Sequence, residues 1–456
     1  MASATRTSLQ HRVWRWHFFA GLAVVPFVLI LSMTGAIYLF KPQYDAAIEQ
    51  QINAKAASAA DSAEALNAEA VLDTALARHE GSSLVRLILP TSPTDRAMEA
   101  EIITGQGEAK TLWIDKSSGS VLHEAPTDGR FMAFIKRIHS SLLGGNLGSL
   151  LVETMACWAI ILFVTGLYLW WPRSGPWWRM FVPDFSGAKR LRPILFKLHG
   201  AVGSWVSVLA LVMLISGLPW TQVWGEGFTR AKALAGLETP GQVWFVTLQS
   251  SDPHAMHNMG GSLWQTENPA ADEEVATPAQ EMTGTPLDIG EVVEQALSEG
   301  FAPPVWLQPP RGDNGVWTVR GMNANRFKQE TVHYDRWSGE EVMRIRFEDQ
   351  NVVDQTMAVG VSFHEGALFG WINQVLGVIA ALGVAGLAVT GTLMWWKRKP
   401  ESRIGVPPMP ADKRIAAGVV VAIIVLGVLL PMAGLTLLIC LIADFVWSAV
   451  SRRIVA

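Results

Sequence analysis

The chain has 456 residues, of which 50% are hydrophobic and only 17% are charged. Soluble domains carry about 25% charged residues, so a large part of this chain faces something other than water. The net charge is −4, and no basic face indicates a nucleic-acid partner. Cys157 and Cys440, the two cysteines, both lie in apolar stretches, which excludes a disulfide framework, a CxxCH attachment motif and a thiolate metal site.

Long apolar stretches predict membrane-spanning helices, because about 20 apolar residues cross a bilayer. We expect four such helices, at residues 11–41, 139–172, 198–220 and 364–397. A further stretch, 415–450, is too long for one ordinary span and is interrupted by Pro431 and Gly434, which predicts a hairpin of two more helices. The sequence therefore predicts six spans surrounded by membrane lipid.

Basic residues predict the orientation of these spans. Clusters of Lys and Arg precede the first span, fill the connection 173–197, follow the fourth span and end the chain. Positive residues favour the cytoplasmic side, so both termini are expected there, and the long connections 42–138 and 221–363 are expected outside the cytoplasm. The first apolar stretch is too long for a signal peptide and lacks a cleavage site, so we expect it to remain as an anchor.

An internal duplication is the strongest pattern in the sequence, and such repeats define architectures. His17 is followed by Gly21 and by Thr34-Gly35, and His199 is followed at the same offsets by Gly203 and by Ser216-Gly217. Likewise, His139 precedes Thr165-Gly166 and Trp170, and His364 precedes Thr390-Gly391 and Trp395, with offsets of 31 to each tryptophan. The helical part of the chain therefore occurs twice.

The long extracytoplasmic connections repeat as well. Residues 111–119 and 331–339 both read as strand, Asp-containing turn and strand. Each is preceded by a helical pattern, Ala68–Arg78 or Ile289–Ser298, and by a strand candidate, Val85–Leu89 or Val305–Leu307. We expect an α-helical membrane protein in which a unit of helix, small α+β domain and helix is duplicated.

Four histidines at corresponding places indicate a cofactor. Two helices related by a repeat can present facing imidazoles to a haem iron, and ionisable groups at membrane depth are usually functional. We expect His17 and His199 to ligate one b-type haem near the cytoplasmic side, and His139 and His364 to ligate a second near the other side. For any one of these histidines alone, an ordinary hydrogen-bonded interfacial or capping residue is the simpler interpretation.

Glycines near these histidines fit the same hypothesis. Gly21 and Gly203, four residues after their histidines, share a helical face with them and would let a flat macrocycle approach the backbone. An offset of 18 predicts that Gly35 and Gly217 face the bundle interior near the opposite membrane surface. Gly166 and Gly391 do not share a face with the preceding histidines on a continuous helix, and for them we expect close helix packing alone.

Other metal and redox chemistry is less well supported by the sequence. A di-iron or copper site needs ligands beyond the histidines, and Glu153 is the carboxylate inside these spans. His254, Met256, His257 and Met259 form a short His/Met stretch that could bind copper or contact a ligand, although a loop insertion is the simpler interpretation. The cytoplasmic connections contain no nucleotide-binding motif, so another molecule must supply any electrons.

The chain resembles the PepSY-associated transmembrane proteins, also called iron-regulated membrane proteins. The resemblance covers about residues 11–400 and rests on motifs in order: Trp14-Arg15-Trp16-His17, His139-Ser-Ser-Leu-Leu-Gly, Leu198-His199-Gly200, Phe363-His364-Glu365-Gly366 and Trp395-Trp396. It implies a bacterial inner-membrane protein with PepSY domains at 42–138 and 221–363 in the periplasm and a four-helix haem-binding bundle. The hairpin at 415–450 departs from four-span members.

Two functions from different classes follow. Some relatives reduce ferric siderophores through b-type haems, which implies an electron conduit that reduces a periplasmic ferric chelate, with quinol or a cytoplasmic reductase as donor. The alternative is a non-enzymatic protein whose PepSY domains bind or regulate periplasmic partners. Transport is a weaker third hypothesis, because the repeats run parallel and no interrupted span carries a charge pair.

Overall fold

The computed structural model describes residues 2–58, 67–92, 94–186, 190–237, 286–312, 315–398 and 417–455. The chain divides into two compact units. The first, here the helical unit, comprises Met1–Leu39, Ile135–Phe228 and Trp371–Ala456, and the second, here the sheet unit, comprises Phe40–Phe134 and Thr229–Gly370. His254 and His257 lie outside the described residues.

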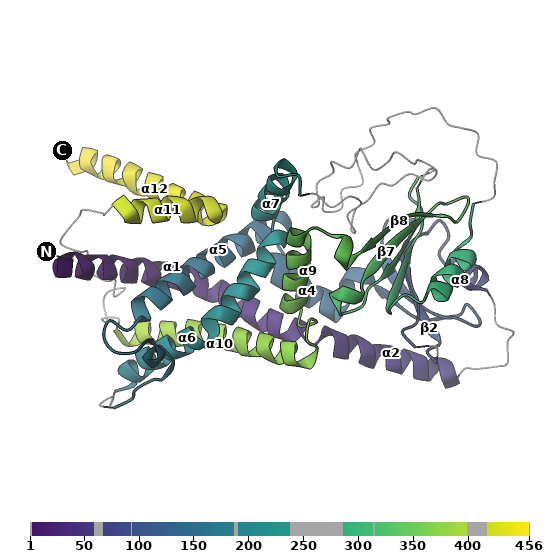
Figure 1. Ribbon diagram of the computed structural model, residues 1–456, viewed down its shortest axis with the longest axis horizontal. Coiled ribbons are helices and arrows are strands. Elements are labelled where there is room, and N and C mark those ends of the chain that lie inside the picture. Colours follow the sequence, from purple (N-terminus) through teal and green to yellow (C-terminus); the bar gives the residue numbers. More distant parts are fainter. Residues whose placement is uncertain are drawn as a thin grey trace. The chain divides into compact units, whose positions relative to one another are not determined.

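Among the described residues, four helices of the helical unit are long and apolar enough to cross a membrane. They are α1 (Ala2–Tyr38), α5 (Gly145–Trp170), α6 (Leu191–Gly217) and α10 (Trp371–Arg398) (Figure 1). Helices α1 and α6 each contact both α5 and α10, which makes a four-membered ring. A short 3-10 helix, Trp177–Phe181, lies between α5 and α6, and another, Leu218–Trp220, follows α6.

The second and fourth long helices begin later than the sequence suggested. The expected spans started at His139 and His364, whereas α5 starts at Gly145 and α10 at Trp371. His139 instead belongs to the short helix α4 (Phe131–Ser141), which a turn at Leu142 and Leu143 separates from α5. Both leucines adopt positive φ angles of 50° and 61°, which cannot continue a right-handed helix.

A glycine permits this sharp turn. A Cβ atom on Gly148 would lie 1.7 Å from the backbone oxygen of Ser141, so a side chain at this position would force α4 away from α5. His364 likewise ends a separate helix, α9 (Val352–His364), and Gly366 and Gly370 follow at positive φ. The breaks after these histidines are local backbone features that an apolar pattern does not reveal.

The C-terminal hairpin is present as α11 (Ala417–Leu429) and α12 (Pro431–Val455). The Trp158 indole donates to Thr436 Oγ1 at 2.9 Å, and buried Leu430, Met432 and Ala433 pack against Cys157 of α5. The described apolar parts of these two helices are shorter than the four long ones. A hairpin attached to the ring is therefore observed, and the fifth and sixth spans remain a prediction.

The sheet unit contains one continuous antiparallel sheet in the order β4-β3-β2-β1-β5-β6-β7-β8. Its strands are β1 (Ser83–Ile88), β2 (Ala97–Ile103), β3 (Ala109–Asp115), β4 (Val121–Pro126), β5 (Val305–Gln308), β6 (Trp317–Gly321), β7 (Glu330–Tyr334) and β8 (Glu341–Arg346). We expected two small α+β domains, and instead β1 pairs with β5 and joins both halves. This pairing covers two strand edges that would otherwise be exposed.

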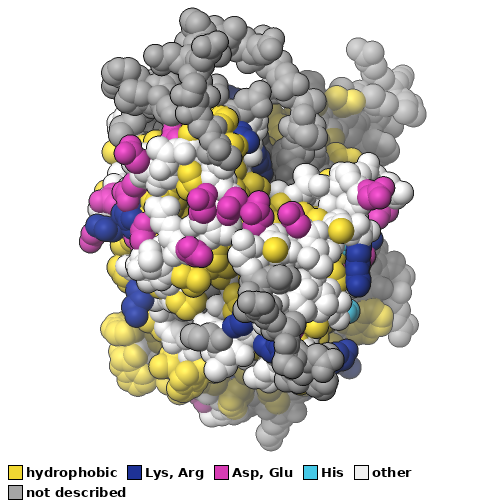
Figure 2. Space-filling view, turned by 90° about the vertical axis from the view of Figure 1, so that its right-hand side faces the viewer, with side chains coloured by type: hydrophobic (Ala, Val, Ile, Leu, Met, Phe, Trp, Pro, Cys, Tyr) yellow, Lys and Arg dark blue, Asp and Glu magenta, His cyan; other side chains and the backbone are white. Residues whose placement is uncertain are grey.

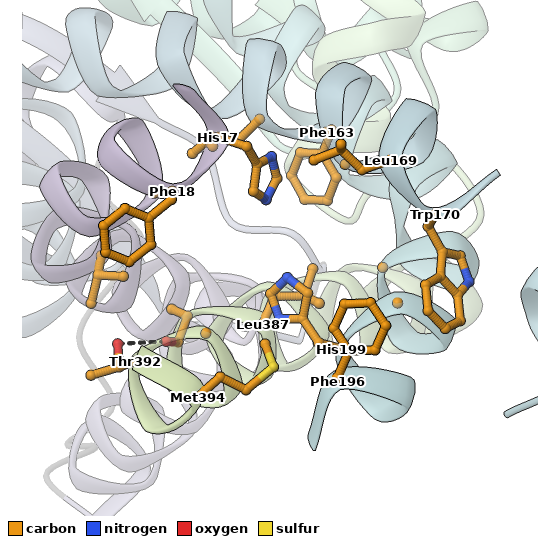
Figure 3. Close-up of a pocket in the computed structure, with 18 of the residues that line it drawn as sticks. His17, Phe18, Phe163, Leu169, Trp170, Phe196, His199, Leu387, Thr392 and Met394 are labelled. Atoms are coloured by element: carbon orange, nitrogen blue, oxygen red, sulfur yellow. Dashed lines mark hydrogen bonds between the residues drawn. The ribbon is translucent and has the colours of Figure 1, made fainter. Parts of the chain in front are cut away.

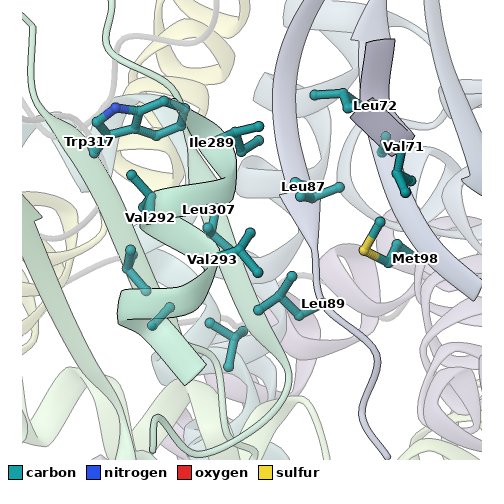
Figure 4. Close-up of a cluster of buried hydrophobic side chains, with 14 of the residues drawn as sticks. Val71, Leu72, Leu87, Leu89, Met98, Ile289, Val292, Val293, Leu307 and Trp317 are labelled. Atoms are coloured by element: carbon teal, nitrogen blue, oxygen red, sulfur yellow. The ribbon is translucent and has the colours of Figure 1, made fainter. Parts of the chain in front are cut away.

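Helices α3 (Ala68–Leu76) and α8 (Ile289–Glu299) lie against the hydrophobic core of this sheet. Alternate strand residues contribute to the core, for example Leu87 and Leu89. Figure 4 shows Leu87 and Leu307 of the sheet in this core together with Val71 of α3 and Val292 of α8. The predicted hairpin turns are confirmed, because Asp115 accepts backbone N–H bonds from Ser117 and Ser118, and Asp335 does the same for Trp337 and Ser338. The unit also contains α2 (Lys41–Ser58) and short 3-10 helices at Thr127–Gly129, Arg326–Lys328 and Phe347–Asp349.

Negative charge gathers at one place on the sheet unit. On the face drawn in Figure 2, Asp and Glu side chains form a band.

Two carboxylates lie close together at the starts of α3 and α8. The Asp288 carboxylate at the start of α8, with smaller effects of burial and Asp73, raises the pKa of Glu69 in the first turn of α3. Helix N-termini favour negative charge, which offsets part of this repulsion.

Candidate functional site

A cavity of about 590 Å³ lies inside the ring of four helices. It is lined by residues of α1, α5, α6 and α10, most of them apolar, and its volume lies in the range of small-molecule and cofactor sites, about 300–1,000 Å³. His17 and His199 contribute the imidazoles among its lining residues. In Figure 3 the two rings extend from α1 and α6 toward one another across the cavity.

Each imidazole is held by a threonine on the neighbouring helix. The Nδ1 atom of His17 lies 2.9 Å from Thr165 Oγ1 on α5, and the Nδ1 atom of His199 lies 2.9 Å from Thr390 Oγ1 on α10. Both hydroxyls donate their own protons backward along their helices, to the backbone oxygens of Ile161 and Gly386 at 2.7 Å. Each threonine oxygen is therefore an acceptor toward the histidine.

This geometry determines which nitrogen of each ring is available. Because the threonine accepts, Nδ1 must carry the proton, and a neutral imidazole then has an unprotonated Nε2. That lone pair is what a metal ion binds, and a hydrogen bond at the other nitrogen fixes both tautomer and ring orientation. His17 and His199 thus have the tautomer of a metal ligand.

Glycines give the two rings room. A Cβ atom on Gly166 would lie 3.2 Å from Cε1 of His17, and a Cβ atom on Gly391 would lie 3.6 Å from Cε1 of His199. These are the glycines for which the sequence predicted close packing alone; the packing partner is the histidine ring. Gly21 and Gly203 line the cavity. A Cβ atom on either glycine would meet a leucine methyl group, at 3.9 Å for Gly21 and 3.6 Å for Gly203.

His139 repeats the arrangement with α1. Its Nδ1 atom lies 3.0 Å from the backbone oxygen of Leu31 and 3.2 Å from Thr34 Oγ1. A backbone oxygen only accepts, so Nδ1 of His139 carries the proton in the neutral ring. A Cβ atom on Gly35 of α1 would lie 3.0 Å from Cε1 of the His139 ring, so the ring packs against α1 at this glycine.

The second histidine pair is divided between the two units. His139 belongs to the helical unit, and His364 is the last residue of α9 in the sheet unit. Gly217, the partner of Gly35 in the repeat, is the last residue of α6. Of the two expected ligand pairs, His17 with His199 is the pair whose members both belong to the helical unit.

Glu153, the carboxylate considered as a metal ligand, has a structural role. It is fully buried on α5, and its two oxygens accept the backbone N–H groups of Val223 and Trp224 at 2.9 Å each. These groups are in the first turn of α7 (Gln222–Leu234), where helix N–H groups lack partners within the helix.

Threonines 34, 165 and 390 are site residues whose role the sequence did not assign. Their position before glycine recurred in the repeat, and that recurrence was the available signal. The partner of each threonine is a histidine on another helix, so the pairing appears only once the helices are placed. Arg192 and Arg398 also line the cavity and were not singled out.

A ring of four apolar helices around a histidine-lined cavity, together with an antiparallel sheet unit, defines a multi-pass membrane protein. Residues 14–398 match the family described as PepSY-associated TM region, and the chain belongs to this family. The family indicates an integral membrane protein of the iron-regulated membrane protein type. No curated protein matches the sequence.

Proposed function

We propose that the cavity binds a b-type haem, whose iron the Nε2 atoms of His17 and His199 would hold. The observation that carries this proposal is the pair of threonine bonds, which leave both Nε2 atoms unprotonated in rings that extend toward one another. A histidine with a purely structural role would not require that both rings leave Nε2 unprotonated. A haem with two imidazole ligands has no open coordination position and supplies one-electron transfer.

The residues around the imidazoles fit a haem in other respects. The cavity walls are largely apolar, with Phe18, Phe163 and Leu387 among them, as a porphyrin face requires. Gly21 and Gly203, one turn from the histidines, leave the backbone open to a flat ring. The donor set, the volume and the glycines support the proposal.

For a second haem, the proposal rests on the sequence. His139 and His364 stand at equal distances before Trp170 and Trp395, as members of a duplicated helix–PepSY–helix unit. The threonine contact of His139 supports a ligand role for that residue, because its Nδ1 atom is engaged in the same way. We therefore propose two b-type haems, one inside the four-helix bundle and one held by His139 and His364.

The reaction that fits such a protein is electron transfer across the bacterial inner membrane to a ferric chelate, such as a ferric siderophore, in the periplasm. Each Fe(III) takes up one electron to give Fe(II), which hard-oxygen chelators hold far more weakly. Quinol or a cytoplasmic reductase would supply the electrons, and both termini would lie in the cytoplasm. The family supports a membrane protein of the iron-regulated type. Two imidazole ligands would leave no iron position open for a substrate, which favours electron transfer. The basic clusters in the sequence support the cytoplasmic position of the termini.

A non-enzymatic function of the sheet unit is the second candidate. Its eight-stranded sheet could bind a periplasmic protein or peptide without any redox step. The two candidates differ in one direct observable, because only the first requires a visible absorption spectrum.

The test begins with the purified full-length protein. We expect a reduced-minus-oxidised spectrum of b-type haem at about two haems per chain, and loss of about one haem on His199→Ala or His17→Ala. His123→Ala, in strand β4 of the sheet unit, is the matched control and should retain both. A full haem complement in all four single histidine variants would refute the ligand assignment.

The acceptor is tested separately. The protein is reduced with dithionite, freed of excess reductant and mixed anaerobically with ferric siderophores. Reoxidation of the haem absorbance together with capture of Fe(II) by ferrozine supports ferric-chelate reduction. If the protein binds haem but stays reduced with every ferric chelate, the electron acceptor is a different molecule; a protein without haem supports the binding function.

A further inference from the structure

Two arginines occupy one end of the cavity. Among the described residues that line it, Arg192 at the start of α6 and Arg398 at the end of α10 are the charged ones. The remainder of the lining is apolar or uncharged, apart from the histidines themselves. The cavity therefore has one positive end.

That end lies beyond the imidazoles. Arg192 precedes His199 by seven residues, which is about 10 Å along a helix axis at 1.5 Å per residue. Arg398 follows Thr390, the partner of His199, by eight residues, or about 12 Å in the opposite chain direction. Because α6 and α10 are antiparallel, both arginines lie about two turns from His199 toward the same end of the ring.

Packing holds Arg398 at the cavity wall. Its guanidinium lies 4.8 Å from the ring centre of Phe18 and 5.2 Å from that of Trp14, and both aromatic residues line the cavity. Cation–π contacts of this kind hold the guanidinium against aromatic rings of the cavity wall. Arg192 and Arg398 also repel one another electrostatically.

Two positive side chains at one end of an otherwise largely apolar cavity favour an anion there. Arginine binds carboxylates through paired N–H groups, and such charge-assisted bonds are stronger than neutral ones. Haem carries two carboxylates, its propionates, on one edge of an otherwise apolar ring. If the two propionates lay in the apolar part of the cavity, their negative charges would be without partners, and burying such charges at membrane depth costs free energy.

We propose that Arg192 and Arg398 bind the propionate groups of the haem held by His17 and His199. This inference rests on the proposed haem site and adds which residues would hold the haem carboxylates: the propionates would lie at the arginine end of the cavity. The arginines are positioning residues, since they hold the carboxylates rather than the iron. Their positive charge also favours the reduced form of the haem.

The test uses the haem-loaded full-length protein with Arg192→Gln, Arg398→Gln and the double variant. Redox titration should resolve two haem components, of which one falls in midpoint potential in the double variant by about 59 mV, a tenfold change in its one-electron equilibrium. Resonance Raman propionate bands of the same haem should shift as the arginine bonds are lost. The other haem component provides an internal reference.

Conservative variants separate charge from packing. Arg192→Lys and Arg398→Lys keep the charge and should restore most of the potential and the Raman bands. Lys197→Gln removes a charge from α6 whose side chain bonds the Ser186 backbone oxygen rather than lining the cavity, and it should change neither readout.

Three outcomes would overturn the inference. Unchanged potential and Raman bands in the double variant of a haem-loaded protein would refute propionate binding while leaving the haem site intact. The same unchanged spectra with loss of co-purified anionic lipid would assign the arginines to phospholipid headgroups. A wild-type protein without haem absorbance would refute the proposed function and this inference together.

Discussion

The Nδ1 atom of His17 lies 2.9 Å from Thr165 Oγ1, although 148 residues separate them in the chain. His199 and Thr390, 191 residues apart, have the same relationship at the same distance. In both pairs the threonine proton is already donated to its own helix, so the bond fixes the histidine tautomer rather than merely filling space. The contact also ties α1 to α5 and α6 to α10 at the level of the cavity.

The first prediction concerns Thr165. Thr165→Val keeps the shape of the side chain but removes the acceptor, so the His17 ring loses its fixed orientation. Loss of such a supporting bond costs about 10–100-fold in metal affinity, and we expect faster haem loss from the purified protein by a factor in that range. Haem transfer to apomyoglobin measures this rate.

Matched variants accompany it. Thr165→Ser retains the hydroxyl and should behave as wild type. Thr392→Val also changes a threonine of the cavity lining, but its hydroxyl donates only to the Ala388 backbone oxygen, and it should leave haem transfer unchanged. Equal rates for Thr165→Val and Thr392→Val would show that the His17 bond has no role in ligation.

The second prediction compares two helix glycines. Gly35→Ala would place a Cβ atom 3.0 Å from the His139 ring, whereas nothing lies within 4 Å of a Cβ atom on Gly386. Alanine gains about 0.5–1 kcal/mol over glycine in a helix interior, so Gly386→Ala should stabilise the protein. Gly35→Ala should not stabilise the protein, because the added methyl group displaces the His139 ring from its hydrogen-bond partners Leu31 and Thr34.

Thermal unfolding and haem content of the two variants give the comparison. We expect a higher melting temperature for Gly386→Ala than for Gly35→Ala, and a lower haem content for Gly35→Ala alone. Identical melting temperatures would mean that the His139 ring can shift without cost.

Much of this architecture could be predicted from the sequence because it follows from local periodicity. Apolar length predicted the four long helices, and two strand patterns joined by an Asp-x-x-x-Gly turn predicted the β3–β4 and β7–β8 hairpins. The break after His139 was missed because Leu142 and Leu143 take positive φ values, which leucine rarely does. Apolarity continues through the turn, so no pattern marked it.

Contacts between distant parts of the chain could not be predicted from the sequence. The two half-sheets join through β1 and β5, which are more than two hundred residues apart, and the sequence of neither strand indicates which strand it pairs with. In the same way, the sequence identified His17, His199 and the Thr-Gly pairs as repeated features, but each histidine contacts a threonine of another helix. Those partners follow from helix placement, which the repeat alone did not give.

The third prediction concerns a buried ion pair in the sheet unit. Lys232 of α7 contacts Asp354 of α9, both side chains are nearly inaccessible to solvent, and Asn351 donates to the other Asp354 oxygen at 2.7 Å. Lys232→Met leaves a buried carboxylate without its cation, which costs about 3–5 kcal/mol. Lys232→Met with Asp354→Leu removes both charges and should recover most of that loss.

Hydrogen exchange of the α7 and α9 amides in the full-length protein measures these free energies locally. The single variant should lower protection in both helices, and the double variant should restore it. Protection that is unaffected by Lys232→Met would show that water or another cation stabilises Asp354.

The last prediction concerns the pH dependence of the sheet. His333 on β7 is 1% exposed, and its Nδ1 atom lies 2.9 Å from Thr318 Oγ1 on β6. Burial, with a smaller effect of the nearby Arg320 charge, lowers the pKa of His333 from 6.5 to about 4. The folded state therefore binds fewer protons than the unfolded state between these two values. Stability from the neutral ring is complete above pH 6.5 and is lost as the pH falls toward 4, by about 3 kcal/mol in total.

His333→Gln removes the titration and can still bond Thr318. We expect opening free energies of the β6 and β7 amides, from hydrogen exchange corrected for intrinsic rates, to fall between pH 7 and pH 5 in the wild type and to change less in the variant. The sign follows from proton uptake on opening, since each pH unit below 6.5 favours the open state by at most about 1.4 kcal/mol. Parallel pH profiles for the two proteins would show that His333 does not titrate on opening and that other groups govern the acid stability of this sheet.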